Sequence, residues 1–224
     1  MRWIILLFLA ATLAPTQSQA EGERAGDFDY YVLALSWSPS FCALEGAARG
    51  NPQCDRSLGW VMHGLWPQYD MASSSEAVGQ RNGGWPSYCP TVHRNPSRAD
   101  TAAMADIMGS GGSAWHQWNK HGRCTGLSSD DYYALSRLAF DRVNRPEVLR
   151  RLDRSVTLPA AVIEEAFLEA NSGWTSDMLT ITCKGGRIAE ARLCLTRDLT
   201  PRPCAADVRR DCRATDALLD PINE

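Results

Sequence analysis

The sequence predicts an α+β fold in which helices flank a mostly antiparallel sheet. Its 224 residues are enough for one domain with a substantial apolar core. Strand-like and helix-like segments follow one another without the regular alternation that builds parallel βαβ units. Eight cysteines, an even number, are typical of an exported chain that pairs them in disulfides. We therefore expect a single disulfide-stabilised domain over residues 21–224, preceded by a signal peptide.

The N-terminus has the features of a secretory signal peptide. A basic start at Arg2 precedes the apolar run Trp3–Leu13, which is too short to span a bilayer. Small residues around Ala20 offer a cleavage site, so residues 1–20 are expected to be removed. The expected location is the periplasm or the medium, with no membrane attachment after cleavage. An uncleaved membrane anchor is the alternative interpretation.

Two strands and two loops are expected at the start of the mature chain. Residues 29–37 are aromatic and apolar and predict a buried strand, which a Ser-Pro-Ser sequence ends. A cysteine-bounded loop over 42–54 follows, and residues 60–63 predict a second short strand that ends at His63. Residues 71–84 are rich in Ser and Gly and predict a surface loop.

Helices are expected in the middle of the chain, and a hairpin follows them. The predicted helices cover residues 97–108, 115–124, 130–143 and 158–170. Ser97 is the expected N-cap of the first helix, and Ser128 or Ser129 caps the third. Residues 178–195 predict two strands joined by a turn at Gly185-Gly186.

The helix over 115–124 has an unusual polar face. Four polar side chains share one side of it, at angles of about 0°, 100°, 40° and 140° around the axis: His116, Gln117, Lys120 and His121. Trp115 and Trp118 fall on the opposite side, at about 260° and 200°, and are expected to anchor the helix in the core. Two histidines beside tryptophan favour a functional face over an ordinary solvated one.

His63 and the polar helix face together suggest acid–base chemistry. Histidine both gives and takes protons near neutrality, and a lysine stabilises developing negative charge. Alone, His63 in its apolar strand would be interpreted as a hydrogen-bonded core histidine. Beside the second segment, it is a candidate partner in one reaction, which suits metal-free cleavage of a phosphodiester.

A metal site is the competing interpretation of the three imidazoles. His116 and His121 are five residues apart, which splays them on a helix, whereas zinc hydrolases space two histidines four apart around a glutamate. Lys120 would also repel a cation. We therefore predict no metal and no other cofactor. The net charge of −3 further argues that any nucleic acid is a transient substrate rather than a tightly held partner.

The sequences HGLWP at 63–67 and WNKHGRC at 118–124 resemble the two active-site segments of the ribonuclease T2 family of secreted, RNA-cleaving enzymes. Residues 31–37, 85–90 and 188–194 resemble further stretches of that family. The resemblance implies an antiparallel sheet flanked by helices. It also implies endonucleolytic cleavage of single-stranded RNA through a 2′,3′-cyclic phosphate to 3′-phosphate ends, with DNA excluded.

The resemblance also implies a role for each polar residue. His121 would take the 2′-hydroxyl proton and His63 would protonate the departing 5′ oxygen, while Lys120 would stabilise the phosphorane. His116 would hold the phosphate. The family usually carries Glu where this chain has Gln117, so the charge that favours protonated neighbouring histidines is lost here.

Base recognition is predicted less sharply. Gln68 stands where some members of the family carry an acid that reads the base. Trp66 and Tyr69 are candidates for stacking on a base, with core packing as the alternative for each. We expect a monomer that acts on single-stranded RNA. A secreted member that binds RNA or signals without cleaving it is the alternative function.

Four disulfides are expected. The pair Cys89–Cys124 resembles the central bridge of the family and would fix the catalytic helix. Two further pairs are local guesses and the last takes the cysteines that remain: Cys42–Cys54, Cys183–Cys194 (across the hairpin) and Cys204–Cys212.

Overall fold

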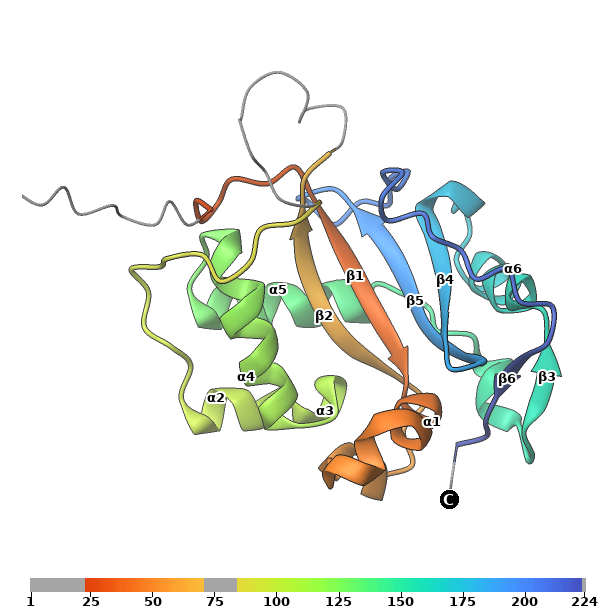
Figure 1. Ribbon diagram of the computed structural model, residues 1–224. Coiled ribbons are helices and arrows are strands. Elements are labelled where there is room, and N and C mark those ends of the chain that lie inside the picture. The colour runs from red at the N-terminus through yellow and green to blue at the C-terminus, as the bar shows by residue number, and fades with distance from the viewer. Residues whose placement is uncertain (1–22, 71–83, 223–224) are drawn as a thin grey trace, which may run out of the picture.

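The computed structural model describes residues 23–70 and 84–222, and its centre is a twisted sheet (Figure 1). The strand order is β2-β1-β5-β6-β3, and β4 pairs with β5 off this path. The strands are β1 (Tyr30–Trp37), β2 (Trp60–Gln68), β3 (Val156–Leu158), β4 (Leu179–Lys184), β5 (Arg187–Leu195) and β6 (Ala217–Leu219). All pairings are antiparallel except the short contact of β5 with β6. The predicted α+β class with a mostly antiparallel sheet is confirmed.

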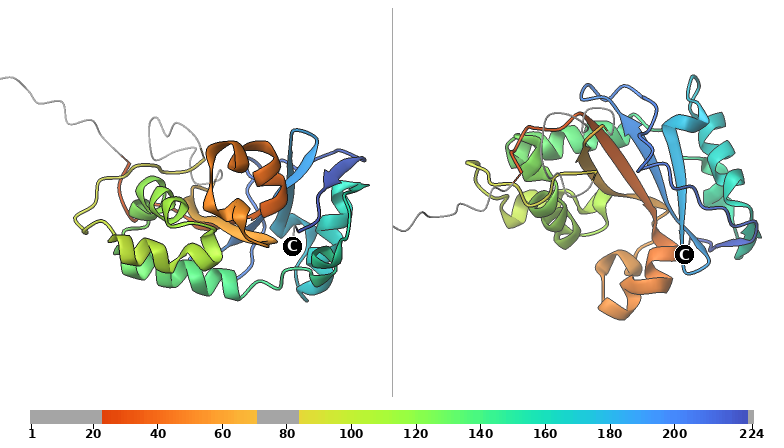
Figure 2. Two further views of the ribbon diagram at one scale, coloured as in Figure 1. Left: turned by 90° about the horizontal axis from the view of Figure 1, so that it is seen from below. Right: turned by 45° about the horizontal axis from the view of Figure 1, so that its top comes forward.

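Helices cover one face and both ends of the sheet. They are α1 (Ser38–Phe41), α2 (Arg98–Ala103), α3 (Ala105–Met108), α4 (Gly111–Lys120), α5 (Ser129–Asp141) and α6 (Ala160–Ala170). In Figure 1, α5 passes behind β1 and β2, and α2, α3 and α4 lie beside the β2 edge. The view from below shows these helices as a layer against the sheet (Figure 2, left). The helix α6 packs near β4 at the other end.

The alternation along β1 separates two environments. Leu33, Leu35 and Trp37 are fully buried and join the main core, which includes Trp118 of α4. The alternate residues of β1 face the other way. Among them, Val32 belongs to a smaller apolar cluster. One face of β1 is therefore main core, and the other carries Val32 and Ser36, each of which lines a cavity.

Several predicted elements begin or end elsewhere than expected. The segment 97–108 is capped by Ser97 as expected, through a capping box with Asp100, but it divides into α2 and α3 at Met104. Ser128 rather than Ser129 caps α5. Leu158 belongs to β3 because it pairs with Ala217, so α6 begins after Pro159.

The predicted end of the first strand at Trp37 is confirmed, but the expected loop over 42–54 was only partly right. Pro39 lies in the first turn of α1, a position that tolerates its missing N–H, so the chain enters helical turns instead of a loop. A π-helical turn over Cys42–Gly46 and two 3₁₀ turns, Ala47–Arg49 and Pro52–Asp55, continue it. The predicted strand end at His63 was wrong, because β2 continues to Gln68.

The predicted signal peptide at 1–20 lies outside the described residues, as does the predicted loop at 71–84 except for Gly84. Among residues 23–70 and 84–222, no helix has both the length and the apolar character needed to cross a membrane.

All eight cysteines form disulfides, but two of the four predicted pairings were wrong. Cys42–Cys54 and Cys89–Cys124 are bridged as expected. The others are Cys183–Cys212 and Cys194–Cys204. In the hairpin, Cys183 stands opposite Ile188 near the turn, whereas Cys194 lies at the far end of β5, too distant for a bridge. The C-terminal segment instead reaches β4, where the Cys212 amide donates to the Ile181 carbonyl over 2.7 Å.

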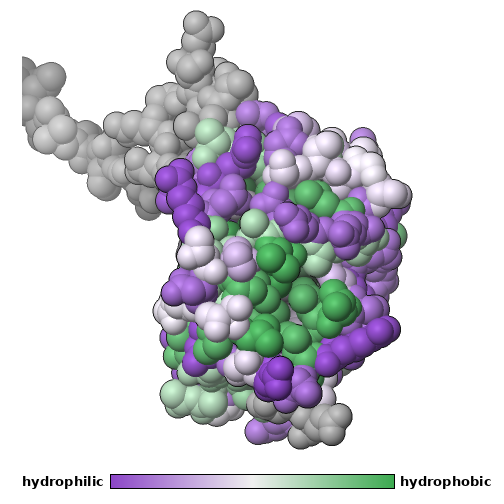
Figure 3. Space-filling view, turned by 90° about the vertical axis from the view of Figure 1, so that its right-hand side faces the viewer, coloured by the Kyte–Doolittle hydropathy of each residue, from purple (hydrophilic) through white to green (hydrophobic). Residues whose placement is uncertain are grey.

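The end of the molecule that carries α6, β3 and β6 is distant from strand β2. On this side apolar side chains gather in the middle of the face within a polar rim (Figure 3). Val162 of α6 is 43% exposed. The polar residues singled out from the sequence lie on β2 and α4, at the other end of the sheet.

Candidate active site

His63 lies at a β-bulge in the middle of β2. Ala34 of β1 pairs with Gly64, and Leu35 pairs with Met62, so His63 has no partner in the ladder. A bulge bends the strand and redirects the side chain of the extra residue. His63 is accordingly the exposed residue of an otherwise largely buried strand, with 45% of its side chain accessible.

Two charged residues of β5 extend across β1 towards His63. Arg192 pairs with Ala34, and Glu190 pairs with Ser36, so small side chains stand between β5 and the bulge. Oε1 of Glu190 lies 2.5 Å from Nδ1 of His63. The other carboxylate oxygen accepts from Nε and Nη2 of Arg192, at 2.8 and 2.7 Å. Although burial alone would raise the pKa of Glu190, its contacts with His63 and Arg192 outweigh it and lower the pKa to about 2.

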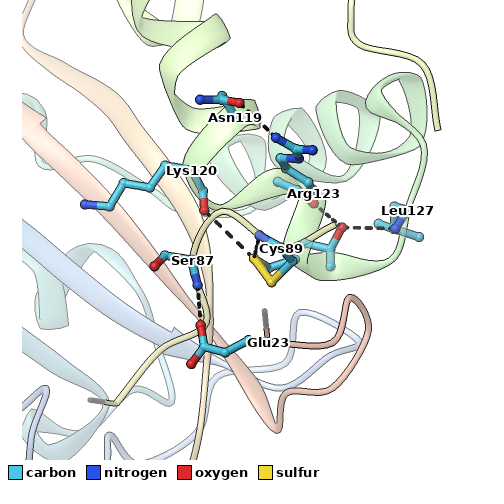
Figure 4. Close-up of a disulfide and its surroundings, with 10 residues drawn as sticks. Glu23, Ser87, Cys89, Asn119, Lys120, Arg123 and Leu127 are labelled. Carbon is cyan, nitrogen blue, oxygen red and sulfur yellow. Dashed lines mark hydrogen bonds between the residues drawn. A yellow bond between two sulfur atoms is a disulfide. The ribbon is translucent and has the colours of Figure 1, made fainter. Parts of the chain in front are cut away.

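The helix α4 presents the second polar segment beside β2. Ser110 caps the helix by accepting from the amide of Ser113, and the helix ends at Lys120. The amide of Tyr88 donates to the Lys120 carbonyl over 2.8 Å, and the Cys89–Cys124 bridge holds the next turn. Figure 4 shows the Lys120 side chain directed away from this disulfide. The bridge therefore fixes the backbone that carries Lys120 and His121.

The four polar residues of the predicted helix face line one cavity, but one of the two predicted anchors is wrong. Trp118 is fully buried, whereas Trp115 is 40% exposed and does not anchor the helix. Gln117 is 2% exposed and His121 is 5% exposed, so the buried side of the helix runs between Gln117 and Trp118. The buried side of the helix thus includes Gln117 from the predicted polar face. Trp115, on the far side from Gln117, faces solvent as a result.

Trp66 connects the two polar segments. Its Nε1 donates to Oε1 of Gln117 over 2.8 Å. Its ring contacts His63 edge-on, with centroids 5.1 Å apart, and lies 5.2 Å from the ring of His121. Trp66 therefore sets the spacing between the imidazoles of β2 and of α4.

His116 of α4 and His121, which directly follows the helix, are electrostatically disfavoured as cations. Burial lowers the pKa of His121 to about 3, helped by the charge of Lys120 and by the other two imidazoles. Its Nδ1 is buried without a hydrogen-bond partner among the described residues. Burial and Lys120 also lower the pKa of His116. His121 is thus neutral and able to accept a proton, while His63 contacts an anion.

These residues line two cavities that meet at His63. The smaller has a volume of about 230 Å³, and its polar lining brings together the predicted residues His63, His116, Gln117, Lys120 and His121, with Trp66 and Gln68. The larger, about 730 Å³, shares His63, His116 and Gln117 and extends past Glu190 towards β4. A cleft with two unlike imidazoles and an ammonium can transfer protons and stabilise an anion.

One predicted substrate-binding residue is not in the cleft. Tyr69 is 3% exposed and belongs to the main core, so its ring offers no face to a base. Trp85, which was not singled out as a site residue, lines the smaller cavity and is 46% exposed. Glu190 and Arg192 were also missed. Their signal was two charges at alternate positions of a strand whose other residues are mostly apolar.

Three of the predicted site residues are histidines, but they do not form a metal-binding cluster. No group of three or more His, Cys, Asp or Glu side chains within residues 23–70 and 84–222 is arranged to hold a metal ion.

Comparison with known proteins identifies the family. The model of the ribonuclease T2 family matches residues 28–204. A ribonuclease of Aeromonas hydrophila is 44% identical over 135 residues, covering 59% of this chain and 55% of its own. Ribonuclease I of Escherichia coli K12 is 22% identical over 244 residues, covering 92% and 90%.

The fold agrees with a solved structure of low sequence identity. An RNase-related protein from Calystegia sepium superposes with a TM-score of 0.63 at 19% identity, covering 88% of this chain and 98% of its own. The chain spans about half the length of the first curated relatives that it matches. The family match, in contrast, includes both polar segments and the strand that carries Glu190. The chain belongs to the ribonuclease T2 family.

Proposed function

We propose that the protein is a metal-independent endoribonuclease that cleaves single-stranded RNA by transphosphorylation. The observation that carries the proposal is the pair of unlike imidazoles around Trp66. His121 is neutral because its pKa is lowered to about 3, and His63 contacts the carboxylate of Glu190. A reaction that needs one base and one acid matches this asymmetry.

In the first step His121 takes the proton of the 2′-hydroxyl, and the 2′ oxygen attacks the phosphorus. The bond from phosphorus to the 5′ oxygen breaks, and His63 gives its proton to that oxygen. Lys120 lines the cavity and supplies positive charge to the phosphorane. RNA provides its own nucleophile, so the protein moves protons and stabilises charge without a resident cofactor.

In the second step the cyclic phosphate is hydrolysed with the roles reversed. His63, now deprotonated, takes a proton from water, and His121 returns its proton to the 2′ oxygen as that bond breaks. The product carries a 3′-phosphate. DNA lacks the 2′-hydroxyl and is not a substrate of this mechanism.

Base recognition belongs to the smaller cavity. Oε1 of Gln68 is buried there without a described hydrogen-bond partner, so it is an acceptor for a donor group on the base. Trp85 and Trp66 line the same space and offer aromatic surfaces for stacking. We assign the base-stacking role to these residues instead of Tyr69.

The decisive experiment incubates the protein with polyuridine in the presence of EDTA and analyses the ends by mass spectrometry. We expect cyclic-phosphate ends that convert to 3′-phosphates, and no cleavage where a single 2′-deoxynucleotide precedes the phosphate. Cleavage that EDTA abolishes would restore the metal interpretation. Absence of cleavage at every pH from about 3 to 8 would favour a non-catalytic RNA-binding protein instead.

We also propose that the mature protein is an exported monomer that begins near Glu21. The four disulfides support an oxidising compartment. Expression with the native N-terminus, fractionation and N-terminal sequencing test this proposal, and light scattering tests the oligomeric state. An uncleaved protein in the membrane fraction would contradict it.

A further inference from the structure

The carboxylate that contacts a catalytic imidazole in this protein comes from strand β5. Glu190 and His63 are separated by 127 residues in sequence, and neither active-site sequence segment contains Glu190. At the position where the family usually has a glutamate, this chain has the neutral Gln117, whose Oε1 is engaged by Trp66. Negative charge at the imidazoles is therefore supplied from the opposite side of the cleft.

Geometry fixes which nitrogen of His63 faces the substrate. An ionised carboxylate only accepts hydrogen bonds, so Nδ1 of His63 donates to Glu190. The remaining nitrogen, Nε2, is then the atom that can give a proton to the departing oxygen. Such a contact sets the tautomer and orientation of an imidazole and favours its charged form.

Glu190 is itself held rigidly. Its side chain is 12% exposed, compared with 45% for His63, and two nitrogens of Arg192 bind the oxygen that His63 does not use. Ala34 and Ser36 stand between β5 and β2 on this face, and their small side chains allow the carboxylate to span the central strand. The guanidinium of Arg192 also lies over the ring of Trp66, 5.5 Å from its centroid.

Among the described contacts, the carboxylate that touches His63 is that of Glu190. The remaining acidic residues that line the two cavities are Glu45 and Asp207. Glu45 is paired with Lys184 and Arg49. The cationic or titratable groups that line the same space with His63 are His116, Lys120 and His121 of the α4 segment, Arg192 of β5, Lys184 of β4 and Arg49. Loss of Glu190 would leave His63 facing a predominantly positive cleft.

From these contacts we propose that Glu190, clamped by Arg192, is a positioning residue that holds the ring of His63 with Nδ1 engaged and leaves Nε2 to act as the general acid. The inference rests on the proposed ribonuclease activity and deepens it. It also gives the protein a source of acid–base asymmetry that does not need a glutamate at position 117.

The test compares Glu190→Gln, which keeps the shape and removes the charge, with Glu190→Asp, which keeps the charge. We expect Glu190→Gln to lower kcat by about 10- to 100-fold with little change in KM. Glu190→Asp should restore part of the lost kcat. Asp106→Asn is the matched control, because it removes a bidentate contact with Arg137 on the helical layer.

A leaving-group comparison separates an effect on the acid from a structural effect. A uridine 3′-phosphodiester with a p-nitrophenol leaving group needs little protonation, so Glu190→Gln should lose at most a few-fold in rate on it. Equal losses on this substrate and on a dinucleotide would overturn the proposal. A wild-type kcat in Glu190→Gln would overturn it too.

The contact is also testable without turnover. The proton on Nδ1 of His63 should give a downfield NMR resonance that disappears in Glu190→Gln and persists in Asp106→Asn. If the wild type cleaves no RNA but shows this pattern, the contact stands and the proposed function fails. Persistence of the resonance in Glu190→Gln would refute the role of Glu190 itself.

Discussion

The indole nitrogen of Trp66 donates a hydrogen bond to Oε1 of Gln117 over 2.8 Å, and this bond joins strand β2 to helix α4. The ring of Trp66 contacts one imidazole from each element. An amide accepts this bond as well as a carboxylate would, but it adds no charge. The geometry expected of the family is thus kept while the electrostatics change.

The low proton affinity of His121 predicts activity in acid. Because burial and the nearby charge of Lys120 lower its pKa to about 3, the free enzyme keeps a neutral base well below the pH at which an ordinary histidine protonates. We expect kcat/KM on a dinucleotide to stay on its plateau down to about pH 4. An acid limb near pH 6 would contradict this account of His121.

Gln117→Glu tests the electrostatic role of the amide. A carboxylate beside His121 favours the protonated imidazole, so its pKa should rise and the acid limb should move to higher pH by about one unit or more. Activity above that limb should be retained, because the Trp66 hydrogen bond is kept. The measurement is the kcat/KM profile of both proteins.

The control for this charge is Asn119→Asp on the same helix. Asn119 accepts from Arg123 over 3.1 Å, on the side shown in Figure 4 away from the Lys120 side chain. The new carboxylate would pair with Arg123 and should leave the profile in place. If Gln117→Glu also leaves it in place, then residue 117 does not tune the base.

Gly64→Ala tests the contact between β2 and α4. A Cβ at Gly64 would lie 2.3 Å from both Oε1 of Gln117 and Nε1 of Trp66, so it would enter their hydrogen bond. We expect a fall in kcat of about 10-fold or more and a destabilisation of about 1–3 kcal/mol. Thermal unfolding and steady-state kinetics measure the two effects.

Gly111→Ala is the matched control for that substitution. Its Cβ would meet its nearest neighbours at 3.4 Å, an ordinary contact in the first turn of α4. Stability and kcat should stay close to wild type. Wild-type kinetics in Gly64→Ala would show that the Trp66–Gln117 bond does not position the imidazoles.

Local sequence patterns predicted the elements and the polar face but not the contacts between distant segments. The strand over 29–37 was predictable from its aromatic and apolar run, and the hairpin over 178–195 from alternation on both sides of a Gly-Gly turn. Trp115 was misplaced because a helical wheel shows angles but does not show which side faces the core. Here a buried glutamine is accommodated by a hydrogen bond to Trp66, which moves the buried side towards the polar residues.

Two further errors concern strand register. Pairing Cys183 with Cys194 assumed that two cysteines on one hairpin are neighbours, but the register separates them. The contact between Glu190 and His63 depends on three strands and a bulge, none of which has a local signal. The residues themselves were visible in the sequence, and only the strand order brings them together.

The bulge in β2 inserts one residue more than a regular strand needs between two core residues. Met62 and Leu65 both face the core although they are three residues apart, an odd spacing that a regular strand would forbid. Deleting one residue between them would give the even spacing of a regular strand, so both side chains would stay in the core while the bulge is lost. The hydrophobic interior therefore does not require the extra residue, and its removal would cost the direction of the imidazole rather than the fold.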